Sequence, residues 1–156
     1  NQMIPYVASH VDVPVQRVID PTLLLTSNEY DKIADERLEN EKYLLLYARR
    51  YNPHMEAYAE KLAAENGWKI VEISLRAKNA EKTNRRMFYE AGVEEFLSLT
   101  KYAECVVTNS LHGTIFAVQY SKPLCVFSRE QCDTKIKELL AFNGGVRYGG
   151  ILDRQR

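Results

Sequence analysis

The segment from Thr108 to Thr114 holds the residues of this sequence best suited to chemistry. It lies between an apolar run, which we expect to be a strand, and an expected helix. A helix N-terminus presents free N–H groups and the positive end of the helix dipole, so anions bind there. Asn109 or Ser110 can cap the helix, and Gly113 allows a ligand to approach the backbone closely. The segment therefore predicts an anion-binding site.

His112 is the candidate catalytic residue within this segment. Imidazole can give or take a proton near neutral pH, so His112 can act as a general acid or base, or bind an anion as a cation. The alternative is that it only satisfies buried hydrogen bonds at the helix start. The position of His112 at a strand end favours the catalytic interpretation.

A second candidate site is the segment from Arg76 to Glu90, in which Lys and Arg outnumber Asp and Glu. We expect a long loop there, and long loops in compact domains are often functional. Arg85 and Arg86 could clamp a phosphate or a carboxylate. The competing interpretation is a solvated loop without a ligand.

Weaker candidates lie elsewhere. Asp20 is expected to organise the turn before Pro21 and Thr22. Glu95 is expected to stabilise a helix start. Basic residues that could face the site, but are more often surface charges, are Arg49, Arg50, Arg129, Lys135 and Arg147.

The elements that must position these residues alternate between helix and strand after residue 26. Capping signals and helical spacing predict helices from Thr26 to about Leu38, from Pro53 to Gly67, over 93–102, over 112–120 and from Asp133 to Gly144. Apolar runs predict strands over 42–48, 69–74, 105–108 and 123–127.

Apolar strands separated by helices are typical of a parallel sheet covered on both faces. We therefore expect one α/β domain over residues 1–156, a three-layer Rossmann-like fold. Ligands bind such sheets beyond the carboxyl ends of the strands. The loops after Tyr47, Ser74 and Thr108 should then lie near the site.

Three ordered stretches carry a family resemblance: Asp-Pro-Thr-Leu-Leu-Leu at 20–25, Glu-Glu-Phe-Leu at 94–97, and Thr-Asn-Ser-Leu-His-Gly-Thr at 108–114. In this order and spacing, across residues 18–147, the chain resembles the polysaccharide pyruvyl transferases. The resemblance implies half of a two-domain architecture similar to B-type glycosyltransferases, with this chain as the C-terminal portion of a larger protein. Ser110 departs from the better characterised branch, which has Arg there.

The resemblance also implies an activity, the transfer of pyruvate from phosphoenolpyruvate to a sugar hydroxyl in bacterial exopolysaccharide or cell-surface glycan biosynthesis. No further cofactor and no metal are expected. His112 would be catalytic. The expected substrate-binding residues are Asn109, Ser110, Leu111, Gly113, Thr114, Arg85 and Arg86. The expected partners are the donor, a glycan acceptor and the missing N-terminal half, without which this chain should be inactive.

Composition narrows the remaining function classes. Lys plus Arg and Asp plus Glu number 21 each, so the formal net charge is zero, which argues against a general nucleic-acid binder. No apolar run approaches the roughly 20 residues of a membrane span. The three cysteines show no metal spacing and suit a reducing compartment, so we expect a cytoplasmic protein. Any location at the inner face of the membrane would come through its acceptor.

Two other functions stay open from the sequence. A nucleotide-sugar glycosyltransferase half would share the fold and the anion-binding helix start, but it would usually need a carboxylate for the ribose, for which Glu130 is the candidate. A non-catalytic domain that binds a glycan or an anion is the third interpretation, and Ser110 keeps it open.

Overall fold

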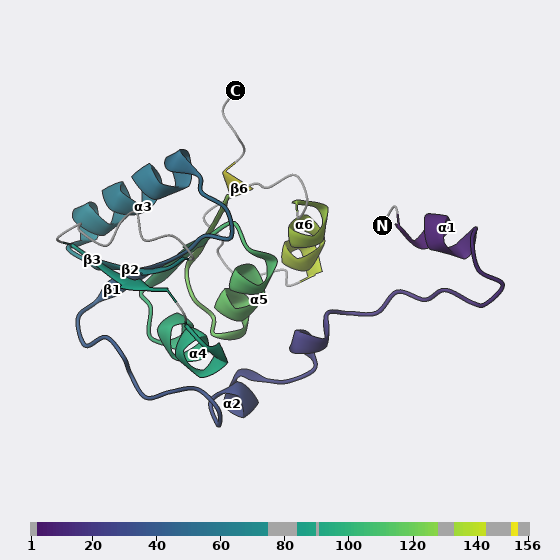
Figure 1. The fold of residues 1–156 in the computed structure, drawn as a ribbon, viewed down its shortest axis with the longest axis horizontal. Coiled ribbons are helices and arrows are strands. Elements are labelled where there is room, and N and C mark those ends of the chain that lie inside the picture. Colours follow the sequence, from purple (N-terminus) through teal and green to yellow (C-terminus); the bar gives the residue numbers. More distant parts are fainter. Residues whose placement is uncertain (1–2, 75–83, 90, 128–132, 143–150, 153–156) are drawn as a thin grey trace.

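A computed structural model describes residues 3–74, 84–89, 91–127, 133–142 and 151–152. Its centre is a parallel sheet of six strands in the order β3-β2-β1-β4-β5-β6. Helices cover both faces of the sheet (Figure 1). This is the strand order of a doubly wound Rossmann-like fold, and the α/β class expected from the sequence is confirmed.

The four strands expected from apolar runs are present with small changes at their ends. They are β1 (Tyr43–Tyr47), β2 (Lys69–Ile73), β4 (Cys105–Thr108) and β5 (Leu124–Phe127). Almost every residue in them is buried, because helices cover both sides of a parallel sheet. The sheet also has two strands that the sequence did not predict, β3 (Arg85–Phe88) and β6 (Ile151–Leu152).

Helix α3 (Pro53–Asn66) covers one face of the sheet. Asn52 caps it by accepting the N–H groups of His54 and Met55, and Gly67 ends it with a φ of 65°. Both ends are therefore those that the sequence predicts. The helix packs Met55, Ala59 and Ala63 against a set of strand residues that includes Leu44, Leu46, Ile70 and Val107.

The other face is covered by α4 (Val93–Lys101), α5 (Leu111–Gln119) and α6 (Asp133–Phe142) (Figure 1). The core on this side includes Leu45, Val71, Leu99, Val106 and Ile136. Because α5 starts directly after β4, its N-terminus lies at the carboxyl edge of the sheet. This arrangement places the start of α5 where Rossmann-like domains bind ligands.

The N-terminal segment contains three short helices: α1 (Met3–Ala8), η1 (Pro21–Leu23) and α2 (Ser27–Tyr30). Helix α1 stands apart from the sheet and its helices, whereas α2 lies near α4 (Figure 1). Thr26 and Glu29 form the predicted capping box.

The prediction of one helix to Leu38 is wrong, because α2 ends at Tyr30. Tertiary hydrogen bonds replace the helix beyond it. The N–H of Asp35 donates to the carbonyl of Glu94, and the hydroxyl of Ser98 donates to the carbonyl of Glu36, both with α4. Within the described ranges, no helix has the length and apolar character that a bilayer crossing requires.

Candidate functional site

The ends of β1 and β4 are joined by Thr108. Its hydroxyl donates to the carbonyl oxygen of Tyr47 at 2.7 Å and accepts the N–H of Ser110 at 3.0 Å. Strand order reverses between these two strands, since β1 leads outward to β2 and β3 and β4 leads outward to β5 and β6. Such a reversal is the usual ligand-binding crevice of an open α/β sheet.

Asn109 ties the loop after β1 to the start of α5. Its side chain is buried, its Oδ1 accepts the N–H of Arg49 at 3.0 Å, and its Nδ2 donates to the carbonyl of Arg50 at 2.8 Å. Both arginines are exposed. The structure therefore brings two cationic residues, which the sequence rated only as weak candidates, next to the predicted anion site.

Ser110 caps α5, as the sequence predicted for Ser110 or Asn109. Its Oγ accepts the N–H of Gly113 at 3.3 Å, and its carbonyl oxygen accepts the hydroxyl of Thr114 at 2.9 Å. Ser110, Gly113 and Thr114 are all buried. Among the described residues, the first-turn amides of Leu111 and His112 have no acceptor, so they are the ones available to an anion.

Gly113 lies against the sheet, and an added Cβ at this position would meet Thr108 Oγ1 at 2.5 Å and Tyr47 Cδ1 at 2.8 Å. Alanine ordinarily favours a helix over glycine by about 1 kcal/mol. We nevertheless expect Gly113→Ala to lower the free energy of unfolding by about 1–3 kcal/mol, because the methyl group would push α5 away from the ends of β1 and β4. Urea denaturation measures the change.

Gly92→Ala is the matched control, since a Cβ there would meet Glu94 Oε2 at 3.4 Å and Glu95 Oε2 at 3.8 Å, both ordinary contacts. We expect a cost of at most about 1 kcal/mol from the altered helix cap. A Gly113→Ala protein as stable as the wild type would show that α5 does not need this close approach.

His112 points away from the core, and its side chain is 57% exposed. The alternative in which it satisfies buried hydrogen bonds is therefore wrong. Its Nε2 lies 3.9 Å from Oδ2 of Asp20. An exposed imidazole beside the free amides of a helix start can exchange protons with a bound ligand.

Asp20 organises its turn as predicted, because its Oδ1 accepts the N–H and the hydroxyl of Thr22. The hydrogen bond from the Thr22 hydroxyl is the main cause that lowers the pKa of Asp20, and the charges of His112 and Lys135 lower it further. The sequence interpretation missed the approach of Asp20 to His112. The sequence did hold one indication of this contact, because both residues lie in the motifs that carry the family resemblance.

Arg85 requires a correction, because the loop expected for residues 76–90 is a strand at Arg85–Phe88. The Arg85 side chain is 1% exposed and forms ion pairs with Glu72 at 2.7 Å, Glu60 at 2.8 Å and Glu56 at 3.1 Å. It lies three strands from β4, which corresponds to roughly 14 Å. The structure thus gives Arg85 a place in the fold and does not bring it to residues 108–114.

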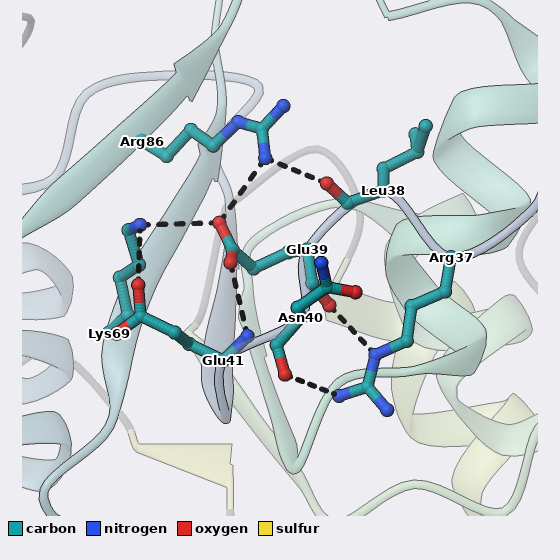
Figure 2. Close-up of polar contacts among 7 residues, drawn as sticks. All are labelled: Arg37, Leu38, Glu39, Asn40, Glu41, Lys69 and Arg86. Carbon is teal, nitrogen blue, oxygen red and sulfur yellow. Dashed lines mark hydrogen bonds and ion pairs between the residues drawn. The ribbon is translucent and has the colours of Figure 1, made fainter.

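Arg86 forms its polar contacts with residues outside the segment 108–114, and Figure 2 shows these contacts. Its guanidinium donates to the carbonyl of Leu38 at 2.7 Å and to Glu39 Oε2 at 3.3 Å, and Glu39 also pairs with Lys69. Glu39 precedes β1 and Lys69 begins β2, so the cluster lies at the amino edge of the sheet. The expected clamp of Arg85 and Arg86 does not form beside His112.

Several other candidates fall outside the described residues, and their predictions stay predictions: Arg76, Lys78, Lys82, Glu90, Arg129, Glu130 and Arg147. Glu95 stabilises a helix start as expected, since its carboxylate accepts the N–H of Gly92 at 2.7 Å. In the part of the chain that the structure describes, no group of three or more His, Cys, Asp or Glu side chains could hold a metal ion.

Comparison with known proteins gives one family. The family model described as polysaccharide pyruvyl transferase matches residues 8–131, which include His112 and Asp20. Among curated proteins, none matches the sequence significantly.

Solved structures share the fold at low sequence identity. A protein designated a UDP-N-acetylglucosamine 2-epimerase from Listeria monocytogenes aligns with a TM-score of 0.53 and 14% identity, over 71% of this chain and 37% of that chain. Two others align with lower scores. They are ADP-heptose LPS heptosyltransferase II of E. coli (TM-score 0.46, 19% identity, 74% of this chain and 41% of that one) and the C-terminal CMP-Kdo binding domain of WaaA from Acinetobacter baumannii (0.47, 12%, 83% and 81%).

The chain thus spans about two fifths of the length of the first two structures.

Proposed function

Because the chain belongs to the polysaccharide pyruvyl transferase family, we propose that the start of α5 binds phosphoenolpyruvate and that His112 takes part in transferring its pyruvyl group to a sugar hydroxyl. One observation carries the proposal. Asn109 fastens the Arg49–Arg50 loop to the start of α5 at the point where strand order reverses. The backbone of two exposed arginines, the free helix amides and the exposed imidazole therefore come together at the reversal of strand order, which is where open α/β sheets bind ligands.

The chemistry of phosphoenolpyruvate fits this set of groups. The donor carries a phosphate and a carboxylate, which arginine side chains and helix N-terminal amides bind. Ketal formation joins two sugar oxygens to the enol carbon of the donor and breaks the bond from that carbon to the phosphate oxygen. Of the two protons that the sugar hydroxyls lose, one goes to the enol methylene carbon and the other leaves with inorganic phosphate. An exposed imidazole can serve one of these proton transfers at neutral pH.

Arg49 and Arg50 supply, in this proposal, the positive charge that an Arg at position 110 would otherwise provide. Ser110 is buried and is the N-cap of α5, so its short side chain cannot reach a donor phosphate as an arginine would. The exposed arginines lie one loop away, held there through Asn109. In this proposal the site still binds an anion, but its cationic side chains follow β1 and not β4.

The proposed site is completed by the rest of a larger protein. The chain spans 37% of the structure that it matches with a TM-score of 0.53, which supports a larger protein with a second half. We propose that this half contributes the acceptor site and further catalytic groups, and that these 156 residues alone bind donor weakly and turn over nothing.

Titration of the intact protein tests the donor. We expect phosphoenolpyruvate to bind at least about 10-fold more tightly than UDP, and phosphate release to require an acceptor glycan. Arg49→Gln/Arg50→Gln should weaken donor binding by about 10- to 100-fold, since a hydrogen bond to a charged group contributes about 1.5–3 kcal/mol. Calorimetry measures the affinities, and a phosphate assay measures turnover.

Lys42→Gln/Lys61→Gln removes the same charge from exposed residues before β1 and on α3, and it should leave binding unchanged. Binding of UDP in preference to phosphoenolpyruvate would instead support a nucleotide-sugar glycosyltransferase. Binding of neither ligand, with an inert intact protein, would support a non-catalytic anion- or glycan-binding domain.

A further inference from the structure

The segment that carries Asp20 is anchored to the helix that carries His112. Gln119, at the end of α5, donates from Nε2 to the carbonyl oxygens of Thr22 at 3.3 Å and Leu25 at 2.8 Å. The hydroxyl of Tyr30 donates to the same Thr22 carbonyl at 2.8 Å. The position of Asp20 relative to α5 is therefore fixed by side-chain hydrogen bonds to backbone carbonyls within η1 and just after it.

The two carboxylate oxygens of Asp20 have different surroundings. Oδ1 accepts the N–H of Thr22 at 3.0 Å and its hydroxyl at 2.6 Å, which sets the orientation of the carboxylate. Oδ2 lies 3.9 Å from Nε2 of His112 and accepts no hydrogen bond from the described residues. Its own turn thus points the unoccupied oxygen of Asp20 toward the imidazole.

The carboxylate is charged at neutral pH. The hydroxyl bond from Thr22 is the main cause that lowers the pKa of Asp20, burial opposes it, and the nearby charges of His112 on α5 and Lys135 on α6 support it. Tyr30 also faces this carboxylate, and its phenol stays neutral because burial, with a smaller effect of Asp20, raises its pKa. The imidazole therefore faces a full negative charge.

The ring of His112 has few other restraints. It is 57% exposed, and among the described residues no hydrogen bond holds either ring nitrogen. A proton-transferring imidazole must keep one orientation, and enzymes commonly set it through a partner on the nitrogen that does not react. Among the described residues, Asp20 is the one carboxylate that forms an ion-pair contact within 4.0 Å of the His112 ring.

We propose that Asp20 is a positioning residue for His112, holding the Nε2 side of the imidazole and leaving Nδ1 to exchange the proton with the substrate. This inference rests on the proposed function of His112. The present separation of 3.9 Å is longer than a hydrogen bond, and contacts of this kind tighten when substrate binds. No proton moves to Asp20 in this scheme, and the carboxylate only orients the ring and balances its charge.

Asp20→Asn in the intact protein tests the role, because an amide oxygen can still accept both Thr22 bonds while the charge is lost. We expect kcat to fall about 10- to 100-fold, as for other groups that orient a reactive ligand, and KM for the donor to change by less than about twofold. Asp20→Glu should recover part of the lost kcat. A normal kcat for Asp20→Asn would overturn the proposal.

Asp31→Asn is the matched control, since Asp31 is a similarly exposed carboxylate of the same segment, paired with Lys101 at 3.0 Å away from His112. It should leave kcat unchanged. A double-mutant cycle shows whether Asp20 acts through His112 or independently of it. In a His112→Ala background, Asp20→Asn should cost nothing further, whereas an equal loss in both backgrounds would contradict the proposal.

Carboxyl-carbon NMR tests the pairing without any activity measurement. The pKa of Asp20 should rise in His112→Ala, because the imidazolium charge that lowers it is removed. An unchanged pKa would overturn the pairing. If the intact protein fails to release phosphate from phosphoenolpyruvate, the proposed function fails, and this titration still decides whether Asp20 faces His112.

Discussion

His112→Ala should lower kcat of the intact protein by about 10²- to 10⁴-fold, the contribution typical of a general acid or base. Its free energy of unfolding changes by less than about 0.5 kcal/mol, because the side chain is exposed and packs into no core cluster. Loss of activity without loss of stability is the combination that separates a reactive residue from a structural one. Phosphate release and urea denaturation of the same preparation measure the two quantities.

His10→Ala controls for the loss of an exposed imidazole. His10 follows α1, the helix that stands apart from the sheet in Figure 1, and its ring contacts Tyr6 and Ser9. We expect normal turnover from this variant. Turnover of His112→Ala within about threefold of the wild type would exclude His112 from proton transfer and leave it, at most, a binding role.

Arg85→Met should lower the free energy of unfolding by about 3–5 kcal/mol, because it breaks a buried ion-pair cluster. The guanidinium is 1% exposed, and two of its partners, Glu72 and Glu56, are 6% and 13% exposed. Methionine keeps most of the volume but removes the buried guanidinium that pairs with Glu72, Glu60 and Glu56. Since whole domains are stable by only about 5–15 kcal/mol, urea denaturation should show the change clearly.

Arg86→Met is the control on the adjacent residue of β3. Its side chain is 44% exposed, and Glu39 keeps Lys69 as a cationic partner at 3.3 Å, so we expect a loss of at most about 1 kcal/mol. Arg85→Met/Glu72→Met should recover part of the stability lost in Arg85→Met, because an apolar pair can replace a buried ion pair. Equal stability of Arg85→Met and the wild type would return Arg85 to the candidates for ligand binding.

The central sheet could be predicted because its signals are local. The runs at Tyr43–Tyr47 and Cys105–Thr108 are apolar throughout, which only strands covered on both faces tolerate. Asn52, Pro53 and Gly67 mark both ends of α3 within a few residues of the chain. Strand β3 carried no such signal, because its residues Arg85 and Arg86 are charged and are stabilised by carboxylates distant in the sequence.

At the candidate site, the sequence alone determined the strand-to-helix junction, a cap at Asn109 or Ser110, and the place of His112 in the first turn of α5, since these depend on residues within one helical turn. The structure decided that Ser110 is the cap and that the His112 side chain is exposed. Only the tertiary structure decided which charged groups surround it. Parallel pairing brings the ends of β1 and β4 together, so Arg49 and Arg50 reach Asn109, while Asp20 arrives because Gln119 and Tyr30 anchor its turn. Arg85 instead pairs with carboxylates of α3 and β2, away from residues 108–114. These partners are separated by 8 to 97 residues, and no propensity within one helical turn encodes contacts at that range.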